Sequence, residues 1–189
     1  RVYVAGHRGL LGSALVRQLN KGGFKNLLLK THQELDLMSQ EQTFRFFEKE
    51  KPEFVFLAAA KVGGIKANMQ ALGSFLYENI QIQSNVIESA RIHGVKKLLF
   101  VGSSCIYPKD ITTFIREEDL LTGPLEPTNE GYAIAKIAGV RMCQFYKKQY
   151  GCDFISAIPT NLYGPGDHYD LERSHLVPAT ILKLHRLKQ

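Results

Sequence analysis

A serine, a tyrosine and a lysine are spaced so that they could move protons to and from a substrate oxygen. Tyr132 and Lys136 lie four residues apart in a segment with helical periodicity, so both side chains leave one face of a helix. A phenol has an ordinary pKa of about 10, and we expect the nearby lysine cation to lower it by about 1–3 units. Ser103 ends a strand-like run and could hydrogen-bond the same substrate oxygen. The three residues predict an acid–base site.

A glycine-rich turn follows the first strand-like run. It comprises Gly6, His7, Arg8, Gly9, Leu10, Leu11 and Gly12, and a helical pattern starts directly behind it. Glycines at this spacing permit a tight turn and the close approach of a pyrophosphate, which the helix N-terminus binds through its unpaired N–H groups. A purely structural turn is the alternative, and a tyrosine four residues before a lysine is common by chance. The combination of both motifs predicts a nicotinamide dinucleotide site.

The residues after the second strand-like run indicate which cofactor binds. NAD-binding proteins usually carry an acid there, which accepts a hydrogen bond from the ribose 2′-hydroxyl. This chain has Lys30 at that place, and its first acids are Glu34 and Asp36. Lys30 and Arg8 would pair with a 2′-phosphate, which predicts NADP(H), unless both are ordinary surface charges. We expect Asp36 and the following Leu37 to lie beside the adenine.

The elements that must position these residues alternate between strand and helix. Apolar strand-like runs cover residues 2–5, 26–30, 54–59, 97–102 and 153–158, and helical patterns separate them. The run at 54–59 is continuously apolar, as in a strand covered on both faces. This order predicts an α/β fold, a Rossmann-type doubly wound parallel sheet with helices on both faces. We expect an NADP-binding domain over residues 1–165 and the start of a substrate-binding domain, otherwise missing, over 166–189.

Composition excludes several classes of protein. The 189 residues are 44% hydrophobic and carry a net charge of +6, but the positive charges are scattered, which argues against a nucleic-acid-binding protein. No apolar run reaches the roughly 18–20 residues that a membrane span needs. The three cysteines, at unrelated spacings, indicate neither a disulfide framework nor a metal site. We expect a cytoplasmic protein with no membrane partner.

Six motifs carry a family resemblance. They are AGHRGLLG at 5–12, AAAKVGG at 58–64, GSSCIYP at 102–108, LEPTN at 125–129, YAIAKIAG at 132–139 and PTNLYGP at 159–165. With these motifs the chain resembles the extended short-chain dehydrogenase/reductase superfamily and, within it, the family of GDP-L-fucose synthases. The resemblance implies an enzyme that epimerises GDP-4-keto-6-deoxy-D-mannose at C3 and C5 and then reduces the C4 ketone with NADPH. It also implies a homodimer that pairs through two long helices.

The resemblance assigns roles to particular residues. Ser103, Tyr132 and Lys136 would form the reductive triad, and Cys105 and His175 would be the acid–base pair of the epimerase. Lys183 would contact the GDP end of the substrate. The NADP contacts would be residues 6–12, Lys30, Asp36, Leu37, Val101, Gly102, Ser103, Ser104, Lys136, Pro159, Thr160, Asn161, Leu162 and His175.

The chemistry of the keto-sugar supports the second pair independently. A C4 ketone acidifies the hydrogens on C3 and C5, and inversion takes a base on one ring face and an acid on the other. The ordinary pKa values of Cys and His, about 8.5 and 6.5, bracket neutrality. Without the resemblance, Cys105 would be interpreted as a small buried hydrophobe that ends the fourth strand.

Two departures from the family and two other functions stay open. His168 replaces the usual asparagine, and the chain ends where the family's C-terminal substrate domain begins. Another NAD(P)-dependent sugar-nucleotide epimerase or dehydratase is the first alternative, although a dehydratase typically has an acid close to the catalytic Ser103. A non-catalytic NADP-sensing module is the second, and the intact triad argues against it.

Overall fold

One parallel sheet forms the centre of the molecule. The computed structural model describes residues 1–171, 174 and 176–187. The sheet has the strand order β2-β1-β3-β4-β5, and all neighbouring strands run parallel. Its strands are β1 (Val2–Ala5), β2 (Leu27–Leu28), β3 (Phe54–Leu57), β4 (Lys97–Val101) and β5 (Phe154–Ala157). The chain starts in the middle of this sheet, and the order reverses between β1 and β3. In sheets of this kind, ligands bind at such a reversal, outside the carboxyl ends of the strands.

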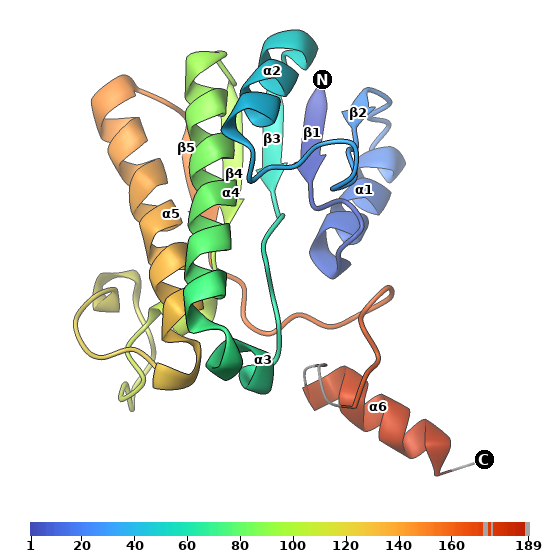
Figure 1. The fold of residues 1–189 in the computed structure, drawn as a ribbon, viewed down its shortest axis with the longest axis vertical. Helices are drawn as coiled ribbons and strands as arrows, with labels where there is room; N and C mark the ends of the chain where they lie inside the picture. Colours follow the sequence, from blue (N-terminus) through green and yellow to red (C-terminus); the bar gives the residue numbers. More distant parts are fainter. Residues whose placement is uncertain (172–173, 175, 188–189) are drawn as a thin grey trace.

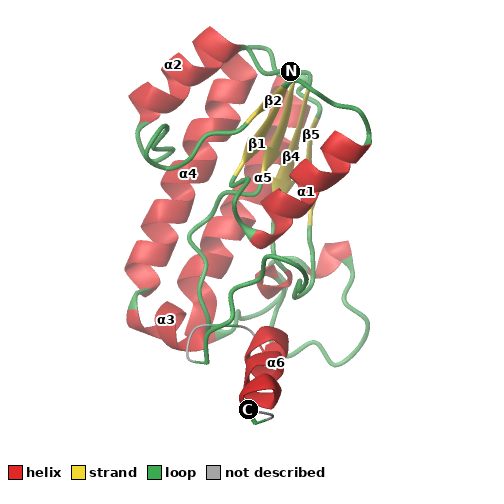
Figure 2. Cartoon of the chain, turned by 90° about the vertical axis from the view of Figure 1, so that its right-hand side faces the viewer, coloured by secondary structure: helices red, strands yellow, loops and turns green. Residues whose placement is uncertain are grey.

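Helices cover the two faces of the sheet unequally (Figures 1 and 2). The helices are α1 (Leu10–Lys21), α2 (Gln40–Glu50), α3 (Ile65–Gln70), α4 (Leu72–Ile92), α5 (Glu130–Tyr150) and α6 (Leu176–Arg186). The long helices α4 and α5 lie side by side on one face together with α2, and α1 lies on the other face (Figure 2). Short 3₁₀ turns follow β4 at η1 (Ser104–Ile106), η2 (Glu117–Asp119) and η3 (Pro127–Asn129). The predicted doubly wound α/β fold is confirmed.

The hydrophobic core lies between the sheet and the α4–α5 pair. Alternate strand residues point into it, including Val55, Leu57, Leu98 and Phe100, and they pack with Val86, Ile87, Ala90 and Val140 of the two helices. On the α1 face, Phe54 remains 40% exposed and Ile155 37% exposed. The prediction that the run at 54–59 is covered on both faces is therefore wrong at the α1 face. Within the described residues, α1 covers only part of that face of the sheet.

Helix α5 approaches β4 closely where it has no side chain. A Cβ atom on Gly139 would lie 2.3 Å from Cζ of Phe100, so only glycine lets the Phe100 ring occupy this place. Phe100 is 1% exposed, and Lys136 stands one helical turn before Gly139 with 3% exposure. This packing fixes the triad lysine against the end of β4.

The other expected elements agree with the structure with small differences. The predicted strand at 26–30 is reduced to Leu27–Leu28, and α6, in the segment expected to start a substrate-binding domain, stands apart from the sheet (Figure 1). Helix α3 was not predicted, since its six residues show no clear period. Among the described helices, none is long and apolar enough to cross a membrane.

Candidate active site

The glycine-rich turn between β1 and α1 leaves no space for side chains at two positions. Gly6 has φ +82°, and a Cβ there would lie 2.7 Å from the backbone nitrogen of Ala59. A Cβ on Gly12 would lie 2.0 Å from the carbonyl oxygen of Gly6. A Cβ on Gly9 would approach only that carbonyl oxygen, at 3.4 Å. The chain therefore requires the first and third glycines itself, whereas the bare backbone at Gly9 stays open to an approaching ligand.

The N-terminus of α1 offers free donors behind this turn. Gly9 caps the helix without any side-chain hydrogen bond, and the first helical turn contains no acidic residue. Its N–H groups and partial positive charge suit an anion such as a pyrophosphate. The side-chain-free backbone at Gly9 and the uncapped helix end fit the predicted dinucleotide.

Two cations gather where β2 ends. Glu34 accepts hydrogen bonds from the backbone N–H and the hydroxyl of Thr31, both at 2.8 Å, and these bonds lower its pKa. The charges of Lys30 and Arg8 lower the same pKa further, which places both cations near this carboxylate. The adjacent Asp36 turns its carboxylate toward the backbone N–H of Met38, at 2.9 Å. Lys30 and Arg8, the predicted partners of a 2′-phosphate, thus both lie near Glu34.

The leucine after Asp36 belongs to the core. Leu37 is 8% exposed, and its carbonyl oxygen accepts a hydrogen bond from Nδ2 of Asn85 at 2.9 Å. Its side chain is thus oriented by the protein interior.

At the end of β4 the structure brings together the serine, cysteine, tyrosine and lysine that the sequence singled out. Nζ of Lys136 donates a hydrogen bond to the carbonyl oxygen of Val101 at 2.8 Å and lies 5.6 Å from the centre of the Tyr132 ring. The Ser103 hydroxyl hydrogen-bonds both the Cys105 thiol and the Tyr132 phenol. The site therefore joins two proton donors, a bridging hydroxyl and a buried amine.

Burial dominates the protonation of these groups. It lowers the pKa of Lys136 to about 8, and a negative charge on Cys105 acts in the opposite direction. Burial likewise raises the pKa of Tyr132, with only partial compensation by the hydrogen bond from Ser103. The expectation that Lys136 would lower the pKa of Tyr132 is wrong in this structure: burial raises this pKa, and the Lys136 ammonium is hydrogen-bonded to the carbonyl of Val101 instead.

The thiol of Cys105 experiences opposing influences. Burial raises its pKa, while the hydrogen bond with Ser103 and the charge of Lys136 lower it. Cys105 is half-buried. Cys105 is therefore not the inert, buried hydrophobic residue that its place at the end of the fourth strand alone would suggest.

The remaining predicted residues follow β5 or lie on α6. Pro159, Thr160, Asn161 and Leu162 continue from the carboxyl end of β5, and Asn161 and Leu162 are exposed. Lys183 is an exposed residue of α6, which stands away from the sheet (Figure 1). His175 lies outside the described residues.

A buried asparagine organises the site, and sequence analysis gave it no role. Asn79 of α4 is 2% exposed; its Oδ1 accepts from the backbone N–H of Lys61 at 2.9 Å, and its Nδ2 donates to the Lys61 carbonyl at 3.0 Å. It thereby fixes the loop after β3, whose first residues Ala58 and Ala59 pack against Gly6. The available signal was a pair of amides, Asn79 and Gln83, on a largely apolar helical face.

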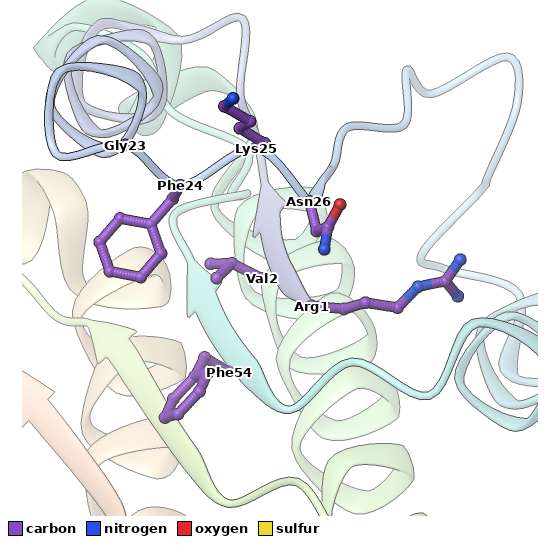
Figure 3. A pocket seen from close by; sticks show the side chains of 7 residues that line it. All are labelled: Arg1, Val2, Gly23, Phe24, Lys25, Asn26 and Phe54. Carbon is purple, nitrogen blue, oxygen red and sulfur yellow. The ribbon is translucent and has the colours of Figure 1, made fainter.

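A hollow lies at the other end of the strands, beside their amino ends (Figure 3). It measures about 350 Å³ and is lined by Arg1, Val2, Gly23, Phe24, Lys25, Asn26 and Phe54. Val2 and Phe54 are the first residues of β1 and β3, so this hollow is remote from the chemistry at the carboxyl ends. Within the described part of the chain, no group of three or more His, Cys, Asp or Glu could hold a metal ion.

Known proteins resemble this chain along its whole length. The model of the NAD-dependent epimerase/dehydratase family matches residues 2–189. A putative GDP-L-fucose synthase 2 from Arabidopsis thaliana is 60% identical over 188 residues, covering 100% of this chain and 57% of the relative. The GDP-L-fucose synthase of Escherichia coli K12 is 51% identical over 185 residues, covering 98% and 58%.

Solved structures also resemble this chain over its whole length. The GDP-mannoheptose C4 reductase MlghC from Campylobacter jejuni, with NADP bound, superposes with a TM-score of 0.94 at 45% identity, over 100% of this chain and 56% of that one. The chain thus spans somewhat more than half the length of the relatives that it matches. By the match over residues 2–189, the chain belongs to the NAD-dependent epimerase/dehydratase family.

Proposed function

We propose that the protein containing this chain makes GDP-L-fucose, by epimerising GDP-4-keto-6-deoxy-D-mannose at C3 and C5 and reducing the C4 ketone. The observation that carries the proposal is the grouping of Ser103, Cys105, Tyr132 and Lys136 at the end of β4. A reductase alone needs the triad, and the added thiol suits an enzyme that also moves protons at carbon. The names of relatives that are 51–60% identical support this combination.

NADP(H) is the proposed cofactor. Gly9 and the N-terminus of α1 would bind its pyrophosphate, and Lys30 with Arg8 would pair with the 2′-phosphate. When bound, NADPH supplies the hydride that reduces C4. The NADP-bound structure of MlghC supports the same choice.

In the proposed reduction, the chain supplies the proton and holds the oxygen. The hydroxyls of Tyr132 and Ser103 would donate hydrogen bonds to the C4 oxygen, which strengthen as negative charge develops on it. Tyr132 gives up its proton as C4 accepts the hydride, so the ketone becomes an alcohol and the phenol a phenolate. The Lys136 ammonium, near the Tyr132 ring, then stabilises that phenolate.

In the proposed epimerisation, the same two donors stabilise the enolate oxygen. Cys105 and His175 would exchange protons with C3 and C5 from opposite ring faces, so that a proton removed from one face is replaced on the other. Cys105 lies beside Ser103, one of the donors to the oxygen. One oxygen site can therefore serve both reactions.

Replacement of Tyr132 tests the proposal. The intact protein should oxidise NADPH when given GDP-4-keto-6-deoxy-D-mannose and should form GDP-L-fucose. Tyr132→Phe should lower the rate of reduction by about 10²–10⁴-fold, the usual contribution of a positioned acid. Tyr107→Phe, at a partly buried tyrosine outside the triad, is the control and should keep the parental rate. Reduction by Tyr132→Phe at the parental rate would remove this phenol from the mechanism.

A C4 reductase for a GDP-linked 4-keto-heptose is the second candidate. The observation that favours it is the likeness to MlghC, which matches all of this chain. Parallel assays with the 6-deoxyhexose and heptose substrates distinguish the two, because a larger sugar needs additional room at C6. Turnover of the heptose with no turnover of the 6-deoxyhexose would establish the second candidate. NADPH binding without turnover of either sugar would favour a sensing module.

A further inference from the structure

The Lys136 ammonium is enclosed by protein on all the sides that the structure describes. Its Nζ lies 4.8 Å from the centre of the Phe100 ring and 5.6 Å from that of Tyr132, and it donates to the Val101 carbonyl at 2.8 Å. Lys136 is 3% exposed and Phe100 1% exposed. A buried cation with a single strong acceptor needs further stabilisation, since desolvation disfavours its charged form.

The face of an aromatic ring can provide that stabilisation. Both rings lie within the roughly 6 Å over which a cation is attracted to a ring face, and such contacts are strongest where water is excluded. Phe100 is the nearer ring, and unlike Tyr132 it takes no part in the proton transfer proposed above. Its position is defined by Gly139, where any Cβ would meet the ring at 2.3 Å.

We infer that Phe100 is a positioning residue of the active site, whose ring face holds the Lys136 side chain in place and favours its ammonium form. The inference deepens the proposed function, because that function is what gives Lys136 its part in the reaction. The two titratable groups of the described chain that face the ammonium are Cys105 from η1 and Tyr132 from α5. Both are neutral when protonated, so within this part of the chain the ring and the carbonyl are the groups that compensate the charge.

Direct titration of Lys136 tests the inference without substrate or cofactor. In the intact protein with ¹³C-labelled lysine Cε, the Lys136 resonance is assigned by its loss in Lys136→Arg and followed against pH. Phe100→Leu keeps an apolar side chain but removes the ring, so the pKa of Lys136, about 8 in the parent, should fall by about one pH unit. At pH 8 the charged fraction would then drop about fivefold, from half to roughly a tenth.

Two further variants separate the ring's charge distribution from its packing. Incorporation of 3,5-difluorophenylalanine at position 100 keeps the ring and weakens its negative face, so the pKa of Lys136 should fall in the same direction by a smaller amount. Phe47→Leu is the matched control: Phe47 is completely buried but packs against Tyr3 and Phe46, so Lys136 should titrate as in the parent.

The outcomes are distinct. An unchanged pKa of Lys136 in both Phe100 replacements would overturn the inference, as would an equal fall in Phe47→Leu, which would indicate general loosening of the core. If the pKa falls only in the Phe100 replacements, the inference holds. It would hold even in a protein that turns over neither keto-sugar, a result that would count against the proposed function alone.

Discussion

At the scale of single residues, the surroundings of Cys105 distinguish this site from that of a simple reductase. Its thiol is hydrogen-bonded to Ser103 and feels the charge of Lys136, and both lower a pKa that burial raises. A thiol under such opposing influences can change protonation when a charged ligand arrives. The epimerisation that we propose requires such a group.

Replacement of Cys105 therefore has an expected isotopic result. In D₂O and without NADPH, the parent should exchange the C3 and C5 hydrogens of the keto-sugar, and Cys105→Ser should slow this exchange by at least about 10²-fold, because a serine hydroxyl is a far weaker acid than a thiol. Mass spectrometry of the recovered sugar measures the exchange. Cys152→Ser, at a half-buried thiol near Arg91, serves as the control. Parental exchange in Cys105→Ser would exclude the thiol from proton transfer.

Lys30 determines the expected cofactor preference. Reversal of its charge in Lys30→Glu should raise the Kd for NADPH about tenfold or more, through loss of a charge-assisted contact, and should change the Kd for NADH much less. Quenching of cofactor fluorescence measures both constants. Lys25→Glu makes the same charge change beside the amino end of β2, away from the predicted cofactor site, and should leave both dissociation constants unaltered. Equal weakening of both cofactors by Lys30→Glu would place the 2′-phosphate elsewhere.

The sequence predicted which residues meet at β4 but not their protonation. Residue types and the four-residue spacing sufficed to select Tyr132 and Lys136, since helical geometry puts them on one face. The pKa of Tyr132 depends on how completely packing removes water, and spacing carries no such information. Asn79 escaped notice for a similar reason, because its partners are backbone groups of a loop 18 residues away.

At the scale of elements, the contact between α5 and β4 leaves no room for a side chain at Gly139. The absent side chain at Gly139 lets the Phe100 ring lie against the helix backbone, and the ring in turn adjoins Lys136. The missing side chain at Gly139 therefore determines how closely α5, which carries Tyr132 and Lys136, packs against β4. A change there should disturb both stability and the site.

Gly139→Ala should be destabilising, although alanine favours helices. Strain from a Cβ placed 2.3 Å from Phe100 is expected to cost about 1–3 kcal/mol, which exceeds the helix-propensity gain of about 1 kcal/mol. Gly73→Ala in α4 is the control, because its Cβ would meet nothing within 4 Å, and it should be neutral or stabilising. Urea unfolding measures the free energies. A Gly139→Ala protein as stable as Gly73→Ala would refute the argument.

Long periodic elements were predictable and short ones were not. The helical segment that was expected to carry Tyr132 and Lys136 is α5, which ends at Gly151, because helical periodicity is a local signal. The second strand was expected over five residues and has two, since pairing with β1 alone determines where it stops. The exposure of Phe54 was missed because an apolar run does not reveal which neighbours cover it.

At the scale of the whole molecule, the α4–α5 pair presents an outer surface that we propose as a dimer interface. The two helices pack together through buried residues, and Gln83 donates to the carbonyl of Ala135 at 2.6 Å. Away from that seam, Tyr77 is 58% exposed, Ile134 41% and Phe145 59%. Large apolar side chains that stay exposed on long helices are typical of an interface.

Sedimentation of the intact protein tests this proposal. We expect twice the mass of one chain at micromolar concentration, and Ile134→Glu should shift the equilibrium toward the monomer, because burying an unpaired carboxylate in an interface is unfavourable. Phe24→Glu, at an exposed residue on the other side of the molecule, should leave the dimer intact. A parent protein that sediments as a monomer would contradict the proposal.

The all-parallel sheet has a consequence for how the molecule reaches its native state. No two neighbouring strands are joined by a hairpin, so every pairing, from β1 with β3 to β4 with β5, closes a long stretch of chain before it yields any gain. The glycine turn and helix α5, which carries Tyr132, come from distant parts of the sequence and depend on the same central strands. We therefore expect these two parts to become competent together, late in folding, so that a partly folded chain would have neither.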